Sequence, residues 1–163
     1  KQRVRQAMAL VGLDFDTFVD RRLETLSGGE KRKVAIASTL ILDQDILLFD
    51  EPTAGMDPQS RIELLSLFTK LQNQGKTILI ATHRLDEIAQ ITDTLSVMKS
   101  GKVLLTSETY KLLLDNKILD EAGLFAPLIV RIHQKLKDNG WPIDHCICLT
   151  SEALITFLKE LTQ

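Results

Sequence analysis

The sequence has little of what would build a disulfide framework, a membrane span or a strongly charged surface. It contains two cysteines among 163 residues, and no apolar run approaches the ~18 residues that a membrane helix needs. Its 20 lysines and arginines nearly balance 22 aspartates and glutamates, so a net charge of −2 gives no reason to expect a nucleic-acid surface. What remains is an ordinary globular balance, with 44% hydrophobic residues.

The N-terminal end lacks both an initiator methionine and a signal peptide pattern. The chain starts with Lys1, inside the helical spacing of Val4, Ala7, Met8 and Val11. We therefore interpret the sequence as part of a longer protein. Its length suits one core, or one domain with a small appendage.

The two cysteines, Cys146 and Cys148, stand next to Asp144 and His145. Thiolate and imidazole are zinc ligands, but no second ligand pair with zinc-finger spacing follows. The cysteines lie two apart on a predicted short strand, so a disulfide between them would be strained. We expect reduced thiols, as in a cytosolic protein.

The order of the predicted elements is that of an α/β protein with a mostly parallel sheet. Two short apolar runs read as buried parallel strands, and Lys99-Ser100-Gly101-Lys102 reads as the turn of a hairpin. The predicted elements are a helix over 30–42, strands over 46–49 and 77–82 with a helix from Pro58 to near Gly75 between them, and hairpin strands over 95–98 and 103–106. We divide the chain into a domain portion at 1–106 and a small helical extension at 107–163.

The segment Ser27-Gly28-Gly29-Glu30 opens the first of these helices. Ser27 and Glu30 have the spacing of a capping box, which needs no ligand. Two successive glycines also leave the helix start bare, so that an anion could reach the backbone N–H groups. Residues 31–33 are all cationic, and they either favour a bound polyphosphate or point into water.

Two acids, Asp50 and Glu51, close the first apolar strand. Neighbours on a strand point opposite ways, so the two carboxylates would serve different tasks. One could support Mg²⁺ and the other could activate an attacking water. The alternative is a pair of acids that only marks a strand end. His83 follows the second strand, and we expect it at the same rim as Glu51 because the strands are parallel.

Three segments resemble the nucleotide-binding domain of ABC ATPases. LSGGE at 26–30 resembles the family signature, ILLFDEPTAGMDP at 46–58 the Walker B strand and D-loop, and THR at 82–84 the switch-histidine motif. The resemblance implies a P-loop NTPase-like half-domain that acts as an ATPase with ATP and Mg²⁺ as cofactors.

The resemblance also assigns roles to single residues. It implies that Asp50 supports Mg²⁺, that Glu51 polarises the attacking water and that His83 contacts the γ-phosphate. Asp57 would lie at the dimer seam. The residues implied to bind the nucleotide of the opposite subunit are Ser27, Gly28, Gly29 and Glu30. The implied partners are a second ABC ATPase subunit, identical or related, and an integral membrane transport subunit, with the protein peripheral on the cytoplasmic face of the cell membrane and no nucleic acid as partner.

The tail is similar to the C-terminal extension of the energy-coupling-factor subgroup. The similarity rests on EAGLFAP at 121–127 and SEALITFL at 151–158. It implies uptake of a vitamin or a metal ion such as cobalt or nickel.

One part of the family pattern is missing from these 163 residues. A phosphate-binding loop needs G-x-x-x-x-G-K-[ST] before a helix. Gly75-Lys76-Thr77 fails this pattern, because position 70 is Lys70 and a strand follows. The resemblance therefore covers the later half of the domain, and we expect this chain alone to bind ATP weakly and to hydrolyse none.

Two other functions stay open at this point. The chain could belong to a soluble ABC-type ATPase that acts on DNA or ribosomes, for which a heptad insertion or a second ATPase unit would argue. It could also be a non-catalytic dimerisation or assembly module, but then Glu51 and His83 would have no purpose.

Overall fold

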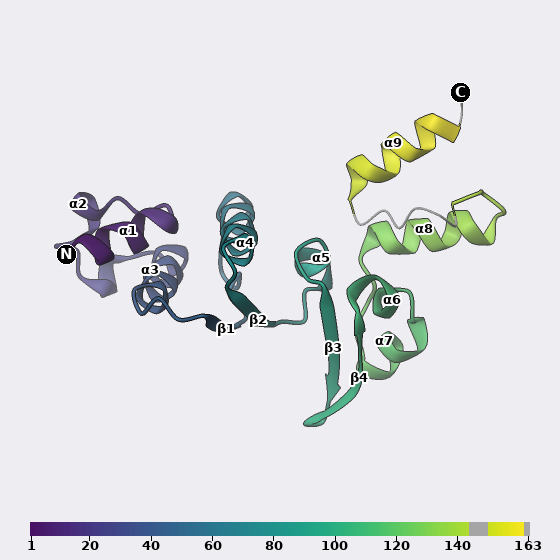
Figure 1. Ribbon diagram of the computed structural model, residues 1–163, viewed down its shortest axis with the longest axis horizontal. Coiled ribbons are helices and arrows are strands. Elements are labelled where there is room, and N and C mark those ends of the chain that lie inside the picture. The colour runs from purple at the N-terminus through teal and green to yellow at the C-terminus, as the bar shows by residue number, and fades with distance from the viewer. Residues whose placement is uncertain (144–149, 162–163) are drawn as a thin grey trace. The chain divides into compact units, whose positions relative to one another are not determined.

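The structure is a computed structural model that describes residues 1–143 and 150–161. The chain forms two compact units, Lys1–Thr82 and His83–Gln163, and each is described by itself (Figure 1). No helix in the described ranges is long and apolar enough to cross a membrane. Cys146 and Cys148 lie outside the described residues, so the expectations for them stay predictions.

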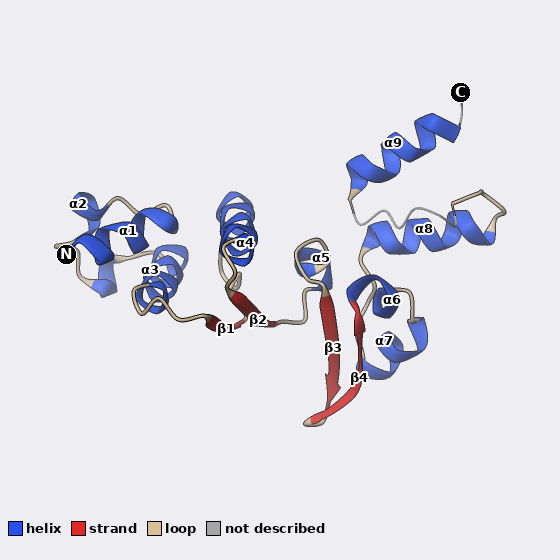
Figure 2. Ribbon diagram, in the orientation of Figure 1, coloured by secondary structure: helices blue, strands red, loops and turns tan. Residues whose placement is uncertain are grey.

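The first unit combines helices with a parallel pair of strands, as Figure 2 shows. Its elements are α1 (Gln2–Leu10), α2 (Phe15–Phe18), the 3₁₀ turn η1 (Leu23–Thr25), α3 (Gly28–Leu40), β1 (Ile46–Asp50), α4 (Pro58–Asn73) and β2 (Thr77–Ala81). Strands β1 and β2 pair in parallel with Ile46 opposite Thr77 and Asp50 opposite Ala81. The parallel pairing predicted for the two apolar runs is confirmed.

One face of β1 is packed against helix α4. Leu47 and Phe49 are buried, and the Phe49 ring stacks on Phe68 of α4 with the ring centroids 4.7 Å apart. The alternate residues Ile46 and Leu48 are 63% and 71% exposed. Because side chains alternate along a strand, helix α4 covers one face and leaves the other uncovered in this unit.

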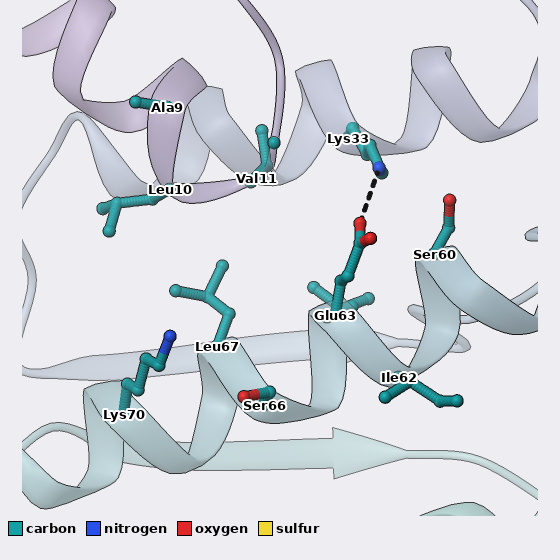
Figure 3. Close-up of a pocket in the computed structure, with 12 residues that line it drawn as sticks. Ala9, Leu10, Val11, Lys33, Ser60, Ile62, Glu63, Ser66, Leu67 and Lys70 are labelled. Atoms are coloured by element: carbon teal, nitrogen blue, oxygen red, sulfur yellow. Dashed lines mark hydrogen bonds and ion pairs between the residues drawn. The ribbon is translucent and has the colours of Figure 1, made fainter.

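Helix α4 begins as predicted, and its buried face overlaps the predicted face only in part. Asp57 is its N-cap and Pro58 its first residue. The predicted apolar face was Ile62, Leu65, Phe68 and Leu71, whereas the buried residues are Leu64, Leu67, Phe68 and Leu71. Ile62 is 63% exposed and lines a cavity of about 430 Å³ between α1 and α4 (Figure 3).

The second unit is built on an antiparallel hairpin. Its elements are α5 (Leu85–Ile88), β3 (Thr94–Lys99), β4 (Lys102–Glu108), α6 (Thr109–Leu113), α7 (Asn116–Ala122), α8 (Leu128–Asp138) and α9 (Ser151–Leu161). The turn residues Ser100 and Gly101 have φ of 50° and 75°, the signs that a two-residue type I′ turn requires. The predicted hairpin is therefore confirmed.

Short helices pack beside this hairpin and form the core of the second unit. The most deeply buried side chains are Leu112 and Leu113 of α6, Leu119 of α7, Val130 of α8 and Ile143. The amide Nε2 of Gln134 donates to the carbonyl of Leu114 at 3.1 Å, which ties α8 to the end of α6. These contacts agree with a helical C-terminal segment, and the proposed boundary between residues 106 and 107 stays a prediction.

The α/β class predicted from the sequence is confirmed in both units. Each unit combines strands with covering helices, and the first has the parallel strand–helix–strand arrangement of P-loop proteins. The carboxyl ends of β1 and β2 meet at one edge, which is where ligands bind in open α/β sheets.

Candidate functional site

The start of α3 is a closed capping box. The backbone N–H of Ser27 donates to the Glu30 carboxylate at 2.7 Å, and the Glu30 N–H donates to Ser27 Oγ at 3.2 Å. The hydrogen bond from the Ser27 N–H holds the pKa of the Glu30 carboxyl below its usual value. The structural role predicted for Ser27 and Glu30 is therefore present.

The same helix start also remains open on its outer side. A Cβ atom added at Gly28 or at Gly29 would meet no other atom within 4 Å. The first backbone N–H groups of a helix have no partner within the helix and carry partial positive charge. The two glycines therefore leave room for an anion beside these donors.

The three cations of the first turn of α3 do not behave alike. Lys31 is exposed. Lys33 pairs with Glu63 of α4 at 3.3 Å, as the dashed line in Figure 3 shows. The guanidinium of Arg32 donates to the backbone carbonyl of Glu51. Two of the three cations thus bind other residues of the first unit. The two alternatives considered for residues 31–33, a bound polyphosphate or exposure to water, did not include this arrangement.

A second cavity brings the signature segment next to the start of α4. It has a volume of about 230 Å³, and Ser27, Gly29, Glu30 and Asp57 are among the residues that line it. The Asp57 carboxylate accepts the N–H of Ser60 at 3.0 Å. Hydrogen bonds with Ser60 lower the pKa of Asp57, so its carboxylate is ionised at neutral pH.

The acidic corner lies where β1 ends. Glu51 follows the strand directly and has φ of 44°, a left-handed conformation that is uncommon outside glycine. Its N–H donates to the carbonyl of Ala81 at 2.8 Å, and the Thr82 hydroxyl donates to its carboxylate at 3.0 Å. The carboxylate of Glu51 is therefore half-buried and held against the carboxyl end of β2.

Two contacts of Glu51 were not predicted from the sequence. Thr82 stands in the THR segment and Arg32 in the cationic turn, but neither was assigned to Glu51. Their sequence separations from it, 31 and 19 residues, give no local signal for these contacts. Only the packing of α3 and β2 at the end of β1 brings them together.

Asp50 differs from its neighbour in being exposed to solvent. Mg²⁺ keeps several waters and takes one or two carboxylates together with phosphate oxygens, so one accessible carboxylate fits a metal that arrives with a nucleotide. Within residues 1–143 and 150–161, no group of three or more His, Cys, Asp or Glu side chains could hold a metal. The donors fit shared binding of Mg²⁺ and not a resident protein cage.

His83 is the first residue of the second unit and is exposed. It follows Thr82 directly in the chain, and Thr82 is the residue that contacts Glu51. His83 and Glu51 belong to different units, and the expected placement of His83 at the rim that holds Glu51 stays a prediction.

Comparison with known sequences gives a consistent result. The sequence profile of the family described as ABC transporter matches residues 1–54. The chain is 39% identical over 163 residues to the energy-coupling factor transporter ATP-binding protein EcfA2 of Mesomycoplasma hyopneumoniae (strain 7448), covering 100% of this chain and 53% of the relative. It is 35% identical over 159 residues to EcfA2 of Clostridium perfringens (strain 13 / Type A), covering 97% of this chain and 56% of the relative. The chain thus spans about half the length of the curated relatives it matches.

Solved structures show the same likeness. The cbiO1 protein from Clostridium perfringens, part of the ABC transporter complex cbiONQ, matches 83% of this chain and 53% of its own, with a TM-score of 0.60 and 32% identity. MJ1267, an ATP-binding cassette of an ABC transporter, matches 73% of this chain and 48% of its own, with a TM-score of 0.63 and 28% identity.

The fold and the site define an α/β domain of the P-loop NTPase class, with an anion-ready helix start and an acidic corner at the carboxyl ends of parallel strands. The motifs, the relatives and the solved cassettes narrow this class. The chain is similar to the ATP-binding proteins of ABC transporters, over about half of their length.

Proposed function

We propose that the protein to which these 163 residues belong is an ATP-binding and ATP-hydrolysing subunit that powers transport across a membrane. The observation that carries this proposal is the arrangement of Glu51, whose half-buried carboxylate is held by the Thr82 hydroxyl at the end of a parallel strand. A carboxylate fixed at that edge is suited to take a proton from water. The likeness to ATP-binding subunits of energy-coupling factor transporters supports the same conclusion.

In this proposal Glu51 orients and deprotonates the water that attacks the terminal phosphate. Asp50 holds Mg²⁺ together with the phosphate oxygens, and the metal supplies charge neutralisation when bound. His83 hydrogen-bonds the γ-phosphate. The site therefore works by positioning and by electrostatic stabilisation, which is the usual division of labour in phosphoryl transfer.

The signature segment acts on the nucleotide of a second ATPase subunit. The open glycines offer backbone N–H groups to phosphate oxygens, and Ser27 adds its hydroxyl. That hydroxyl accepts the Glu30 N–H and still carries one hydrogen that it can donate. Glu30 and Asp57 line the same cavity, with Asp57 at the seam between the subunits. The dimeric solved cassette MJ0796, at 27% identity and a TM-score of 0.61, supports pairing of this kind.

The transported cargo is proposed to be a vitamin or a metal ion. The similarity of residues 107–163 to the extension of the energy-coupling-factor subgroup supports this assignment. The names of the relatives support the subgroup. The protein would then bind an integral membrane subunit at the cytoplasmic face of the membrane. The cargo is tested by measuring the uptake of labelled vitamins, cobalt and nickel by cells with and without the protein. If deletion of the protein reduces the uptake of none of these compounds, the proposed cargo is wrong.

The test of the ATPase proposal is turnover in the full-length protein assembled with its partner subunit. Glu51→Gln keeps the shape of the side chain and removes the base, so kcat should fall by about 10² to 10⁴ while ATP stays bound. Asp45→Asn is the matched control, because it removes a carboxylate just before β1, at the opposite end of the strand. Equal turnover in wild type and Glu51→Gln would remove Glu51 from the proposed role. The 163-residue chain alone should show no turnover.

A further inference from the structure

The N–H, the carboxylate and the carbonyl of Glu51 all form hydrogen bonds, and their partners include residues from β2, from the position directly after it and from α3. Its N–H donates to Ala81 of β2 at 2.8 Å, its carboxylate accepts the Thr82 hydroxyl at 3.0 Å, and its carbonyl accepts the guanidinium of Arg32 from α3. The first two contacts continue from β2, the neighbouring strand. The third comes from the helix that begins at the signature glycines.

The contact from Arg32 stabilises an uncommon backbone conformation at Glu51. The ladder between β1 and β2 ends at Asp50 opposite Ala81, and Glu51 then turns into a left-handed conformation with φ of 44°. A non-glycine residue keeps such a conformation only where its surroundings hold it. The Glu51 carbonyl accepts two hydrogen bonds, one from the backbone N–H of Ala54 at 3.1 Å and one from the Arg32 guanidinium, which is the charged donor of the two.

Arginine suits this task better than a neutral donor. Its guanidinium is charged at every accessible pH and carries five donors in a rigid fork. Hydrogen bonds from a charged donor are stronger than neutral ones. The Arg32 side chain is half-buried, so water competes less for the Glu51 carbonyl.

We propose that Arg32 is a positioning residue for hydrolysis, which fixes the backbone of Glu51 so that its carboxylate is aimed at the attacking water. This inference rests on the proposed function. Arg32 stands four residues after Gly28, so both lie on one face of α3, one turn apart. The residue therefore connects the helix start that faces a nucleotide with the carboxylate that activates water.

The test compares Arg32→Met with wild type in the full-length protein assembled with its partner. Methionine keeps an unbranched apolar stem and removes all donors. The Glu51 carbonyl then loses its charged donor and keeps the Ala54 N–H, so the residue is held less firmly. A displacement of about 1 Å at a reacting group lowers the rate by about 100-fold. We expect kcat to fall on this scale, while the KM for ATP changes by less than about threefold, because a residue that acts through Glu51 affects the transition state and not the binding of ATP.

A double variant separates positioning from general damage. Residues that act as one unit give non-additive losses. In a Glu51→Gln background, Arg32→Met should therefore lower the residual turnover no further. A merely structural role would lower it again.

Lys76→Met is the matched control. The Lys76 ammonium donates to the carbonyl of Asp43 at 3.3 Å, so the variant also removes a cation from a backbone carbonyl. It does so just before β2, at the opposite end of the strand pair from Glu51, and should leave kcat unchanged. If Arg32→Met does not fold, Arg32→Gln takes its place, with a shorter and uncharged donor.

The possible outcomes are distinct. If Glu51→Gln lowers kcat as expected and Arg32→Met behaves like Lys76→Met, the inference on Arg32 is wrong and the proposed function stands. A raised KM with unchanged kcat in Arg32→Met would also overturn it, since Arg32 would then serve nucleotide binding. No turnover in the wild-type assembly would overturn the proposed function, and the inference with it.

Discussion

The two strand pairs of this protein are connected and stabilised in different ways. Strands β3 and β4 are joined by the turn at Ser100 and Gly101, and their pairing is local. Strands β1 and β2 are parallel, so the chain must cross back between them, and helix α4 makes this crossover. The hairpin depends on its turn, whereas the parallel pair depends on the packing of a helix.

The difference between parallel and antiparallel pairing also decides where residues that follow the strands can meet to form a site. Parallel strands end at the same edge, so the residues after β1 and β2 meet there, as Glu51 and Thr82 do. The strands of a hairpin end at opposite edges, and no such meeting follows. The candidate site at the acidic corner of the first unit thus depends on the parallel pairing of β1 and β2.

The largest expected effect is on the helix that supports the parallel pair. Phe68→Ala removes a side chain that is 1% exposed and stacks on Phe49, so the free energy of unfolding of the first unit should fall by about 3–5 kcal/mol. Hydrogen exchange measured by mass spectrometry should show the amides of β1 and β2 exchanging much faster.

The control for this change is Val97→Ala, which alters a buried residue of β3. It should speed exchange in the hairpin and not in β1. Protection of β1 that survives Phe68→Ala would show that the parallel pair does not depend on α4.

A smaller effect is expected at the turn of the hairpin. Gly101→Ala places a Cβ at φ of 75°, which costs about 1–2 kcal/mol for an L-residue. The amides of β3 and β4 should exchange faster by the corresponding factor. Ser100→Gly should alter the stability by less than about 1 kcal/mol, because relief of strain at φ of 50° is offset by a freer unfolded chain. Unchanged exchange in Gly101→Ala would show that the turn does not control the hairpin.

The smallest effect concerns the common starting edge of the parallel strands. The Lys76 ammonium donates to the Asp43 carboxylate at 2.8 Å, which lowers the pKa of Asp43 below its ordinary 3.8 and raises the pKa of Lys76 above its ordinary 10.5. The pair therefore stabilises the fold fully between these two values. Its contribution is lost as the pH falls through the folded-state pKa of Asp43, or rises through that of Lys76.

Asp43→Asn tests this linkage, because asparagine tolerates the φ of 50° found at this position. The midpoint of thermal unfolding should be slightly lower than in wild type at neutral pH, since exposed ion pairs contribute little. The difference should vanish in acid below the folded-state pKa of Asp43. A difference that persists there would assign the effect to something other than the ion pair.

Local signals were sufficient for much of the fold. Lys99-Ser100-Gly101-Lys102 predicted the hairpin, and Asp57-Pro58 predicted the start of α4, because turn and cap preferences act within a few residues. The buried face of α4 was predicted only in part, since Phe68 and Leu71 are buried as expected. Ile62 has the right spacing and is exposed, because what a helix buries depends on what packs against it. That information lies in distant parts of the chain.

The candidate site divides in the same way. The sequence identified Ser27, Glu30 and Asp57, and the structure brings these three around one cavity. It also identified Glu51. The contacts that hold Glu51 were missed, since Arg32 and Thr82 reach it only through the packing of other elements. The catalytic and metal-binding roles of these residues stay predictions until turnover is measured.

At position 30, in the capping box of α3, the hydrogen-bonding role of the side chain can be distinguished from the effect of its charge. The Glu30 carboxylate accepts the Ser27 N–H, and the side-chain oxygen of a glutamine could accept the same bond. The geometry of the helix start would then be the same with either residue. Glutamate adds a negative charge next to two bare glycines. The Arg21 guanidinium lies 4.0 Å from the Glu30 carboxylate and offsets this charge only partly. Glutamate at position 30 therefore disfavours binding of a polyanion at the N-terminus of α3, although the backbone geometry there is unchanged.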